Sequence, residues 1–290
     1  MAYRSRFAPS PTGYLHVGNG YSALLCQQWC QQWGGVLVLR IEDIDYSRCR
    51  PQFDAALIED LGWLGLHWQP EVMRQSERIA YYRAALDQLQ MQGVLYPCFC
   101  SRKSLAAASA PHGVVVQYPG ICRQLAKAEQ QHRMATEPFA WRLNMRLAAE
   151  QIGHQVWWCS VDGVDATAEV DAQDDIVLAR KDIGVAYHLA VVVDDAAQGI
   201  DVVIRGEDLA PSVPVQRVLQ QLLGLSAPRY WHHPLLRDGD GQRLAKRNHS
   251  TTLRSLRAQG VAAQQLAAVL LQAPAPPRWD AAVLDQLLSG

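Results

Sequence analysis

Near its amino terminus the chain reads RFAPSPTGYLHVGN, from Arg6 to Asn19, and this segment carries the strongest indication of the fold. Residues 3–8 are expected to form a short strand, which is followed by three turn-forming residues: Pro9, Pro11 and Gly13. A helix pattern begins at about Gly18, with large apolar residues at intervals of four: Tyr21, Leu25, Trp29 and Trp33. Two glycines at residues 34–35 end the pattern. We therefore expect a strand, a tight turn and a helix in succession.

Residues 36–41, VLVLRI, form a continuous apolar run that ends in Glu42 and Asp43. Such a run is typical of a buried parallel strand. A strand–turn–helix–strand unit predicts a parallel α/β sheet. Since ligands of these sheets bind at the carboxyl ends of the strands, we expect a site where residues 3–8 and 36–41 end.

His16 and Asn19 are expected at the amino terminus of the first helix. Exposed backbone N–H groups and the helix dipole favour a phosphate there, and Gly18 and Gly20 let a nucleotide approach the backbone. An imidazole can also donate a hydrogen bond to charge that develops on an α-phosphate. An isolated His-x-Gly would be an ordinary turn. Here the upstream prolines, the following helix and the acidic strand end favour the nucleotide site.

The second half of the chain carries further apolar segments. Residues 174–180 are expected to form a strand, residues 186–195 are the most apolar run in the chain, and residues 200–204 are expected to form another strand. A helix is expected from Ser212 to Leu223, closed by Gly224.

Composition limits the classes of function. The chain has 290 residues, 49% of them hydrophobic, which is enough for a core and for one or two domains. A net charge of −1 excludes a globally basic nucleic-acid binder and confines any RNA contact to a local patch or groove. No apolar leader is present, and no stretch approaches the ~18 apolar residues of a membrane span. The seven scattered cysteines predict reduced thiols in a cytoplasm, with metal binding as a possibility.

Residues 6–19, taken together with the basic loop RLAKR at residues 243–247, resemble the paired nucleotide-binding signatures of class I aminoacyl-tRNA synthetases. Residues 40–45, RIEDID, resemble the glutamate-pocket strand of glutamyl-tRNA synthetases, and the similarity extends from about Ser5 to about Ser250. The resemblance implies an α/β fold. Its parts would be a Rossmann-like parallel sheet, an inserted subdomain for the acceptor end with a zinc site, and a short helical carboxyl-terminal part.

The same resemblance implies a glutamate site. Its expected residues are Arg6, Phe7, Ala8, Pro9, Ser10, Glu42, Tyr187 and Arg205. Glu42 would hold the α-ammonium group, because a carboxylate suits an ammonium as a planar guanidinium suits a carboxylate. A second cation at Arg205 would help to discriminate glutamate from glutamine. The simpler alternatives are a solvated strand end for Glu42 and, for Arg205, a surface salt bridge with Glu207 or Asp208.

The resemblance also implies an ATP site formed by His16, Gly18, Asn19 and Lys246, with Mg²⁺ on the phosphates. His16 and Lys246 are the expected catalytic residues, and Lys246 would neutralise the triphosphate as pyrophosphate leaves. The chain departs from the family at three positions. Arg243 replaces the usual first lysine of the loop, Ala245 replaces a frequent serine, and His188 stands where asparagine is common.

Three cysteines in the middle of the chain, Cys98, Cys100 and Cys122, indicate a metal site. A structural zinc ion needs four ligands, commonly thiolates, so the fourth would be Tyr118, His112 or water. In the shorter glutamyl-Q tRNA(Asp) synthetases the pattern resembles Cys-x-Cys followed by Tyr-x3-Cys, which favours Tyr118. The alternative is three buried free cysteines. We expect one structural zinc ion per chain.

About forty residues follow the basic loop, too few for an independent anticodon-binding domain. We expect residues 1–95 and 171–225 to be the two halves of the catalytic domain and residues 96–170 to be the inserted subdomain. Residues 226–290 would hold the signature loop and a short helical end. This truncated architecture resembles that of glutamyl-Q tRNA(Asp) synthetases.

By that resemblance the chain would activate L-glutamate with ATP, without tRNA, and transfer glutamate to the queuosine base of tRNA(Asp). It would act as a cytoplasmic monomer without membrane contact. The alternative within the family is a compact glutamyl-tRNA synthetase that charges the tRNA 3′ end. Alternatives of other classes are a non-catalytic paralogue that binds tRNA or glutamate and a ligase for a non-RNA acceptor. The intact set Arg6, His16, Glu42, Arg205 and Lys246 favours an enzyme.

Overall fold

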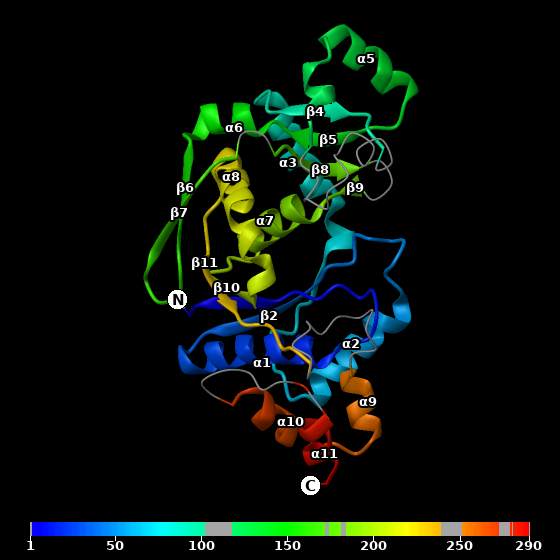
Figure 1. Cartoon of the computed structure of the whole chain (residues 1–290), viewed down its shortest axis with the longest axis vertical. Coiled ribbons are helices and arrows are strands. Elements are labelled where there is room, and N and C mark those ends of the chain that lie inside the picture. The colour runs from blue at the N-terminus through cyan, green and yellow to red at the C-terminus, as the bar shows by residue number, and fades with distance from the viewer. Residues whose placement is uncertain are drawn as a thin grey trace.

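The computed structural model describes residues 2–101, 118–171, 174–180, 184–238, 251–272, 279 and 281–289. Its centre is a five-stranded sheet in the order β11-β10-β1-β2-β3, in which all neighbouring strands are parallel (Figure 1). The strands are β1 (Arg4–Phe7), β2 (Val36–Ile41), β3 (Met73–Arg74), β10 (Val202–Gly206) and β11 (Arg229–His233). The sheet confirms the α/β class expected from the sequence.

Helices cover both faces of this sheet. Helix α1 (Val17–Gln32) connects β1 to β2 and packs on one face, where Leu37 and Leu39 of β2 join its core. Val38, the residue between them, points to the other face and packs with residues of α8 (Val213–Leu223) and β11. This alternation follows from the period of two along a strand. The faces are therefore separate, and side chains at alternate positions of β2 meet different helices.

The strands and the helix expected for the first half of the chain are confirmed. The strand expected at residues 3–8 is β1, the helix expected from Gly18 is α1, and the strand expected at residues 36–41 is β2. In the second half, residues 174–180 contain β8 (Ile176–Arg180), residues 200–204 overlap β10, and α8 ends at Gly224. Gly224 has φ 67°, a left-handed conformation that favours glycine at this position.

The most apolar run, residues 186–195, forms helix α7 (Tyr187–Ala197). An apolar run of this length has no periodicity that separates a buried helix from a buried strand. Helix α7 packs against α3 (Ile79–Met91) and α8, and its apolar residues Leu189–Val192 are buried. It also carries two buried carboxylates, Asp194 and Asp195.

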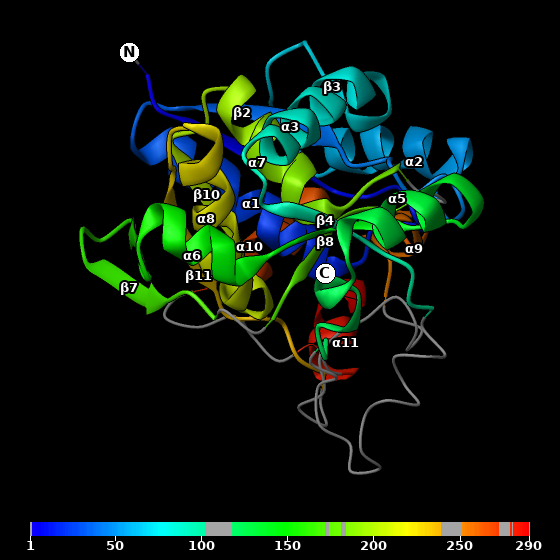
Figure 2. The ribbon, with the colours of Figure 1, turned by 90° about the horizontal axis from the view of Figure 1, so that it is seen from above.

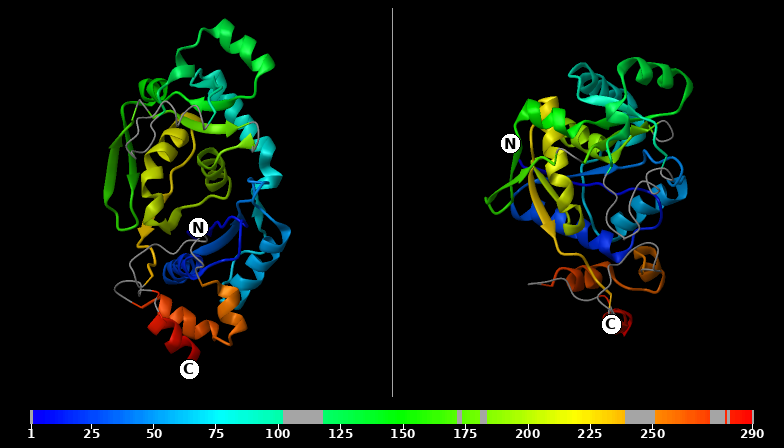
Figure 3. Two further views of the ribbon diagram at one scale, coloured as in Figure 1. Left: turned by 45° about the vertical axis from the view of Figure 1, so that its right-hand side comes forward. Right: turned by 45° about the horizontal axis from the view of Figure 1, so that its top comes forward.

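A second layer lies at one end of the molecule, opposite the carboxyl-terminal helices (Figures 1 and 3). It contains an antiparallel sheet in the order β4-β5-β8-β9 and a separate two-stranded hairpin, β6–β7, which stands out to one side in Figure 2. Its strands are β4 (Leu95–Cys98), β5 (Ala140–Leu143), β6 (Gln155–Cys159), β7 (Asp165–Glu169), β8 and β9 (Gly184–Val185). Its helices are η2 (Ile121–Gln124), α5 (Lys127–Thr136) and α6 (Met145–Ile152).

The remaining helices pack against the five-stranded sheet or connect to it. They are α2 (Pro51–Trp63), η1 (Gln75–Arg78), η3 (Glu207–Ser212), α9 (Leu253–Ala258), α10 (Ala263–Leu270) and α11 (Ala281–Ser289). Helices α9 and α10 share the hydrophobic core of α1 and α2. Among the residues that the structure describes, no helix is long and apolar enough to cross a membrane.

Candidate functional site

A cavity of about 500 Å³ lies at the carboxyl ends of β1, β2 and β10, where the sheet topology places a ligand. Its walls come from the turn after β1, the start of α1, the end of β2, the start of α7 and the end of β10. Every described residue assigned above to glutamate or ATP lines it: Arg6, Phe7, Ala8, Pro9, Ser10, His16, Gly18, Asn19, Glu42, Tyr187 and Arg205. The fold therefore brings both expected subsites into one space.

His16 caps the amino terminus of α1. Its Nδ1 accepts a hydrogen bond from the N–H of Gly18 at 3.1 Å, and the Asn19 Oδ1 accepts one from the N–H of His16 at 3.1 Å. Because Nδ1 accepts, a neutral imidazole carries its proton on Nε2. A Cβ at Gly18 would lie 3.0 Å from the imidazole ring, so glycine leaves room for this cap. The ring thus keeps a donor on its outer nitrogen at a helix end that favours anions.

Two buried arginines and two buried carboxylates form a connected chain beside the cavity. Arg6 Nε lies 3.2 Å from Asp195 Oδ1, and Arg40 Nη1 lies 2.7 Å from the same oxygen. Arg40 Nη2 then lies 3.3 Å from Glu42 Oε1. Of these four residues, Arg6 and Glu42 line the cavity. Glu42 is only 9% exposed, so it is not the solvated strand end considered as the alternative.

The carboxyl of Glu42 favours a positively charged ligand. Burial raises its pKa, and the positive charges of Arg40 and Arg6 only partly oppose this effect. An ammonium group in the cavity would add the missing stabilisation of the carboxylate, because an opposite charge nearby favours the ionised form.

Arg205 is buried, and three of its nitrogens have protein partners. Nε donates to His232 Nε2 at 3.2 Å, Nη1 donates to Tyr187 Oη at 3.4 Å, and Nη2 donates to Gln216 Oε1 at 3.0 Å. These contacts fix the guanidinium at the cavity wall. Burial and the charge of Arg205 lower the pKa of His232 to about 4, so the imidazole is neutral at pH 7 and can accept this bond.

The cavity wall therefore presents complementary charges at separate places. Arg6 and Arg205 can bind a carboxylate, Glu42 can bind an ammonium, and the start of α1 can bind a phosphate. An amino acid with an acidic side chain and a nucleoside triphosphate together match these features.

Four residues of this region were not among those expected from the sequence: Arg40, Asp195, Gln216 and His232. Two adjacent aspartates inside the most apolar run were the available signal, since buried charges need partners. Gln216 and His232 carry no comparable local signal. His188 lies next to Tyr187, with 5.4 Å between the rings, and does not line the cavity. Lys246, Arg243, Ala245 and His112 lie outside the described residues.

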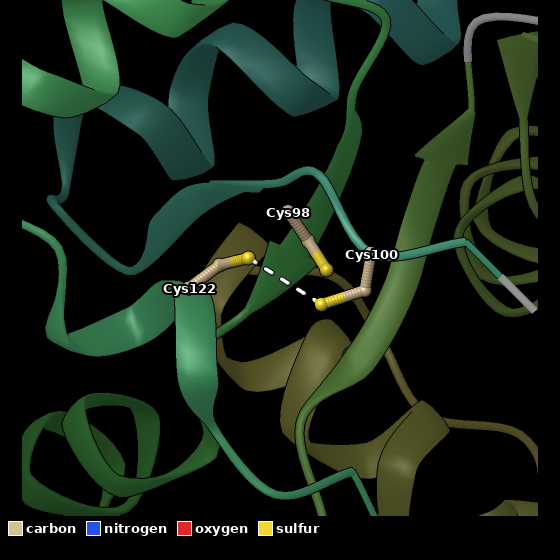
Figure 4. Close-up of side chains that lie close together, drawn as sticks. All are labelled: Cys98, Cys100 and Cys122. Atoms are coloured by element: carbon tan, nitrogen blue, oxygen red, sulfur yellow. Dashed lines mark hydrogen bonds between the residues drawn. The ribbon is translucent and has the colours of Figure 1, made fainter. Parts of the chain in front are cut away.

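Three thiols come together between the end of β4 and η2. The Sγ atoms of Cys98, Cys100 and Cys122 lie within 4.8 Å of one another, with 3.6 Å between those of Cys100 and Cys122 (Figure 4). Tyr118 Oη lies 3.5 Å from Cys98 Sγ and 4.0 Å from Cys100 Sγ. The cluster could hold a metal ion, and sulfur and oxygen donors are both accepted by Zn²⁺.

The ring of Tyr118 is held in place by two further contacts. Its Oη accepts a hydrogen bond from the N–H of Cys122 at 2.9 Å, and the guanidinium of Arg142 lies 3.8 Å from the ring centroid. Burial raises the pKa of Tyr118, and the hydrogen bond with Cys98 raises it further. A bound cation would act in the opposite direction and favour the phenolate. The phenol oxygen of Tyr118 thus lies beside the three thiols, at hydrogen-bond distance from the Cys122 N–H.

Comparison with known proteins identifies the class. Residues 2–283 match the family model of the catalytic domain of class I tRNA synthetases (E and Q). A glutamyl-Q tRNA(Asp) synthetase of Rhodobacter capsulatus is 44% identical over 88% of this chain and 95% of its own length. One of Nocardia farcinica is 43% identical over 94% of this chain and 86% of its own. The chain therefore belongs to the class I tRNA synthetase family and, within it, to the branch of the glutamyl-Q tRNA(Asp) synthetases.

Solved structures give the same class. A glutamate tRNA ligase from Elizabethkingia meningosepticum, in complex with its amino acid, superposes with a TM-score of 0.75 at 25% identity over 93% of this chain. A glutamate-tRNA synthetase from Elizabethkingia anophelis superposes with a TM-score of 0.76 at 26% identity. This chain spans 61% and 62% of the lengths of those two proteins.

Proposed function

We propose that the chain activates L-glutamate with ATP, without tRNA, and then transfers the glutamyl group to the queuosine base of tRNA(Asp). The observation that carries this proposal is the single cavity in which Arg6, Glu42 and Arg205 meet the capped amino terminus of α1. The two relatives described above are named glutamyl-Q tRNA(Asp) synthetases, which supports the choice of acceptor.

In the first step, Arg6 and Arg205 bind the side-chain carboxylate of glutamate and Glu42 binds its α-ammonium. The α-carboxylate is then oriented toward the α-phosphorus of ATP. One of its oxygens forms a bond to that phosphorus as the bond to the β-phosphate oxygen breaks, and pyrophosphate leaves. Orientation of the two substrates supplies much of the rate enhancement in such displacements.

The phosphates are held at the start of α1. The Nε2–H of His16 donates to the α-phosphate as its negative charge increases, and the backbone near Gly18 and Asn19 contributes the field of the helix. Lys246 neutralises the departing pyrophosphate, a role that rests on family resemblance. Mg²⁺ on ATP supplies further charge neutralisation.

In the second step, a nucleophilic group of the queuosine base attacks the carbonyl carbon of glutamyl-adenylate. The bond between that carbon and the phosphate oxygen breaks, and AMP leaves with the bonding electrons. No covalent enzyme intermediate is required. Residues 1–95 and 171–225 supply the catalytic halves, residues 96–170 receive the RNA, and residues 226–290 carry the signature loop. The enzyme acts as a monomer, and its cytoplasmic location stays a prediction.

The cysteine cluster holds one structural zinc ion in this proposal. Cys98, Cys100, Cys122 and Tyr118 would be its ligands and would connect the end of β4 to η2. The ion would have a structural role and stabilise the inserted subdomain, because four protein ligands complete the coordination usual for structural zinc and leave no position for a reacting water.

The first test is ATP–pyrophosphate exchange in the absence of tRNA, with glutamate, glutamine or aspartate as the amino acid. Exchange with glutamate alone is the expected result. The second test uses labelled glutamate and tRNA(Asp) that lacks its 3′-terminal adenosine, with and without queuosine. Transfer that requires queuosine supports the proposal. Transfer that requires the terminal adenosine would instead identify an enzyme that charges the 3′ end.

A further inference from the structure

We propose that Asp195 is a positioning residue of the glutamate pocket, which acts through Arg40 and Arg6 to place the cavity groups Arg6 and Glu42. The proposal rests on the glutamate activation proposed above. Asp195 does not line the cavity, and its side chain is 8% exposed. It would therefore act without touching the substrate.

The sheet brings the two arginines to the same side. In the β1–β2 register Arg6 is paired with Val38, and Arg40 follows Val38 by two residues. Side chains at alternate positions point to the same face, so both arginines project away from α1. Helix α7 lies over that face and delivers the carboxylate of Asp195 between them.

One oxygen atom connects the parts of the pocket. Asp195 Oδ1 lies 3.2 Å from Arg6 Nε and 2.7 Å from Arg40 Nη1, and the other terminal nitrogen of Arg40, Nη2, lies 3.3 Å from Glu42 Oε1. The distance between Arg6 and Glu42, which line the cavity, is thus set by two residues that do not line it. Arg40 is fully buried, so water cannot replace its partners.

Asp195 also balances the local charge. Arg6, Arg40, Asp195 and Glu42 together are neutral when both carboxylates are ionised. Burial alone would raise the pKa of Asp195, but Arg6 and Arg40 hold it below its usual value, so this carboxylate is charged at neutral pH. Without that charge the set would be positive, and Glu42 would face two arginines with no second anion.

The neighbouring residue provides a matched control. Asp194 is also buried on α7, and its carboxylate accepts hydrogen bonds from Gln75 at 2.9 Å, Arg78 at 2.7 Å and Tyr82 at 2.8 Å. None of these three partners lines the glutamate cavity. Asp194→Asn therefore removes a buried charge from the same helix without changing the partners of Arg6.

The test is ATP–pyrophosphate exchange with the wild type, Asp195→Asn and Asp194→Asn. Asparagine keeps an oxygen that can accept from both arginines, so only the charge is lost. In Asp195→Asn, we expect KM for glutamate to rise by about tenfold, since a hydrogen bond to a charged acceptor is stronger than one to a neutral amide oxygen by about this factor. KM for ATP should change little. Asp194→Asn should lower the melting temperature and leave KM for glutamate near the wild-type value.

The pH dependence of KM for glutamate distinguishes a positioning role of Asp195 from partial unfolding of the variant. The charged or titratable groups that act on Glu42 are Arg40 from β2, Arg6 from β1, and Tyr187 and Asp195 from α7. Asp195 raises the pKa of Glu42, so its removal should shift the acid limb of the glutamate KM profile to lower pH. A variant that was only partly unfolded would keep the limb at the wild-type pH.

Arg40→Lys is the second variant, for the case that Asp195→Asn does not fold. A single ammonium cannot hold both Asp195 and Glu42 as the two guanidinium nitrogens do, so KM for glutamate should again rise. If the wild type exchanges with glutamate and the folded variants keep the wild-type KM for glutamate, the positioning role of Asp195 is overturned and the proposed function is not. No exchange by the wild type with glutamate, with or without tRNA, would overturn the proposed function and this inference with it.

Discussion

Replacing Glu42 with glutamine tests how the cavity recognises the α-ammonium group of its substrate. Glutamine has nearly the same volume as glutamate, and its side-chain oxygen can still accept the hydrogen bond from Arg40. Arg40 also keeps Asp195 at 2.7 Å. The substitution therefore changes the charge of the cavity wall and little else.

The expected magnitude follows from burial. Glu42 is 9% exposed, so its partner in the cavity would be withdrawn from water with it. Breaking a buried ion pair by removing one partner costs about 3–5 kcal/mol, and about 1.4 kcal/mol corresponds to a tenfold change. We therefore expect kcat/KM for glutamate to fall by a factor of about 10² to 4 × 10³.

In Glu42→Gln, the stability of the folded protein should not fall together with the activity. Burial raises the pKa of Glu42 in the folded protein, so the ionised carboxylate is less favourable there than in the unfolded chain. Stability contributed by this group is present at low pH and is lost as the pH rises through the folded-state pKa. Above that pKa, Glu42→Gln removes the penalty, and its melting temperature should equal or exceed that of the wild type.

Exchange kinetics between acidic and mildly alkaline pH provide the assay. In the wild type, KM for glutamate should fall as the pH rises through the pKa of Glu42, because the carboxylate is the form that binds an ammonium. In the variant this dependence should disappear, while KM for ATP serves as the internal control. A kcat/KM for glutamate within a factor of about three of the wild type would refute the reasoning, since a loss of only ~0.6 kcal/mol is too small for a buried ion pair.

Four further substitutions test the other groups. His16→Asn keeps an oxygen that can cap α1 but removes the outer ring donor; exchange should fall by about 10² to 10³ at unchanged melting temperature, and retained activity would exclude the imidazole from catalysis. Arg205→Gln should lower the preference for glutamate over glutamine at least about tenfold, as measured by the ratio of their kcat/KM values; an unchanged ratio would place discrimination elsewhere. Cys122→Ser should lose zinc by elemental analysis and melt at lower temperature, and Tyr118→Phe should weaken zinc retention against a chelator. Full zinc content in Cys122→Ser would exclude this thiol as a ligand.

Much of the site could be predicted because its residues are contiguous. Residues 6–19 contain a strand end, a turn and a helix start, and these are governed by local preferences for proline, glycine and capping groups. Glu42 could be placed as well, since it directly follows an apolar run that forms a strand. The same reasoning placed Arg205 at the end of β10. The basic loop falls within residues 239–250, which lie outside the described residues, so its prediction still rests on the sequence pattern.

The environment of these residues could not be predicted in the same way. The sequence suggested a surface salt bridge as the alternative for Arg205, whereas the structure surrounds its guanidinium with Tyr187, His232 and Gln216. Those three partners come from α7, β11 and α8. Their positions relative to Arg205 depend on how three elements pack, and no spacing in the chain encodes this directly.

By itself, the sequence determined the parallel α/β class, the strand ends that form the cavity and the residue types that line it. These properties depend on periodicity, turn residues and short motifs within a few neighbouring residues. Only the tertiary structure decided that residues 187–197 form a helix and that Asp195 on it connects Arg6 to Arg40. The sequence pattern already favoured Tyr118 as a partner of the cysteines, and the structure added the distances of its Oη, 3.5 Å from Cys98 Sγ and 4.0 Å from Cys100 Sγ. The physical reason is that a buried charge or donor is stabilised by partners brought from distant segments, and packing of the whole chain determines which partners these are.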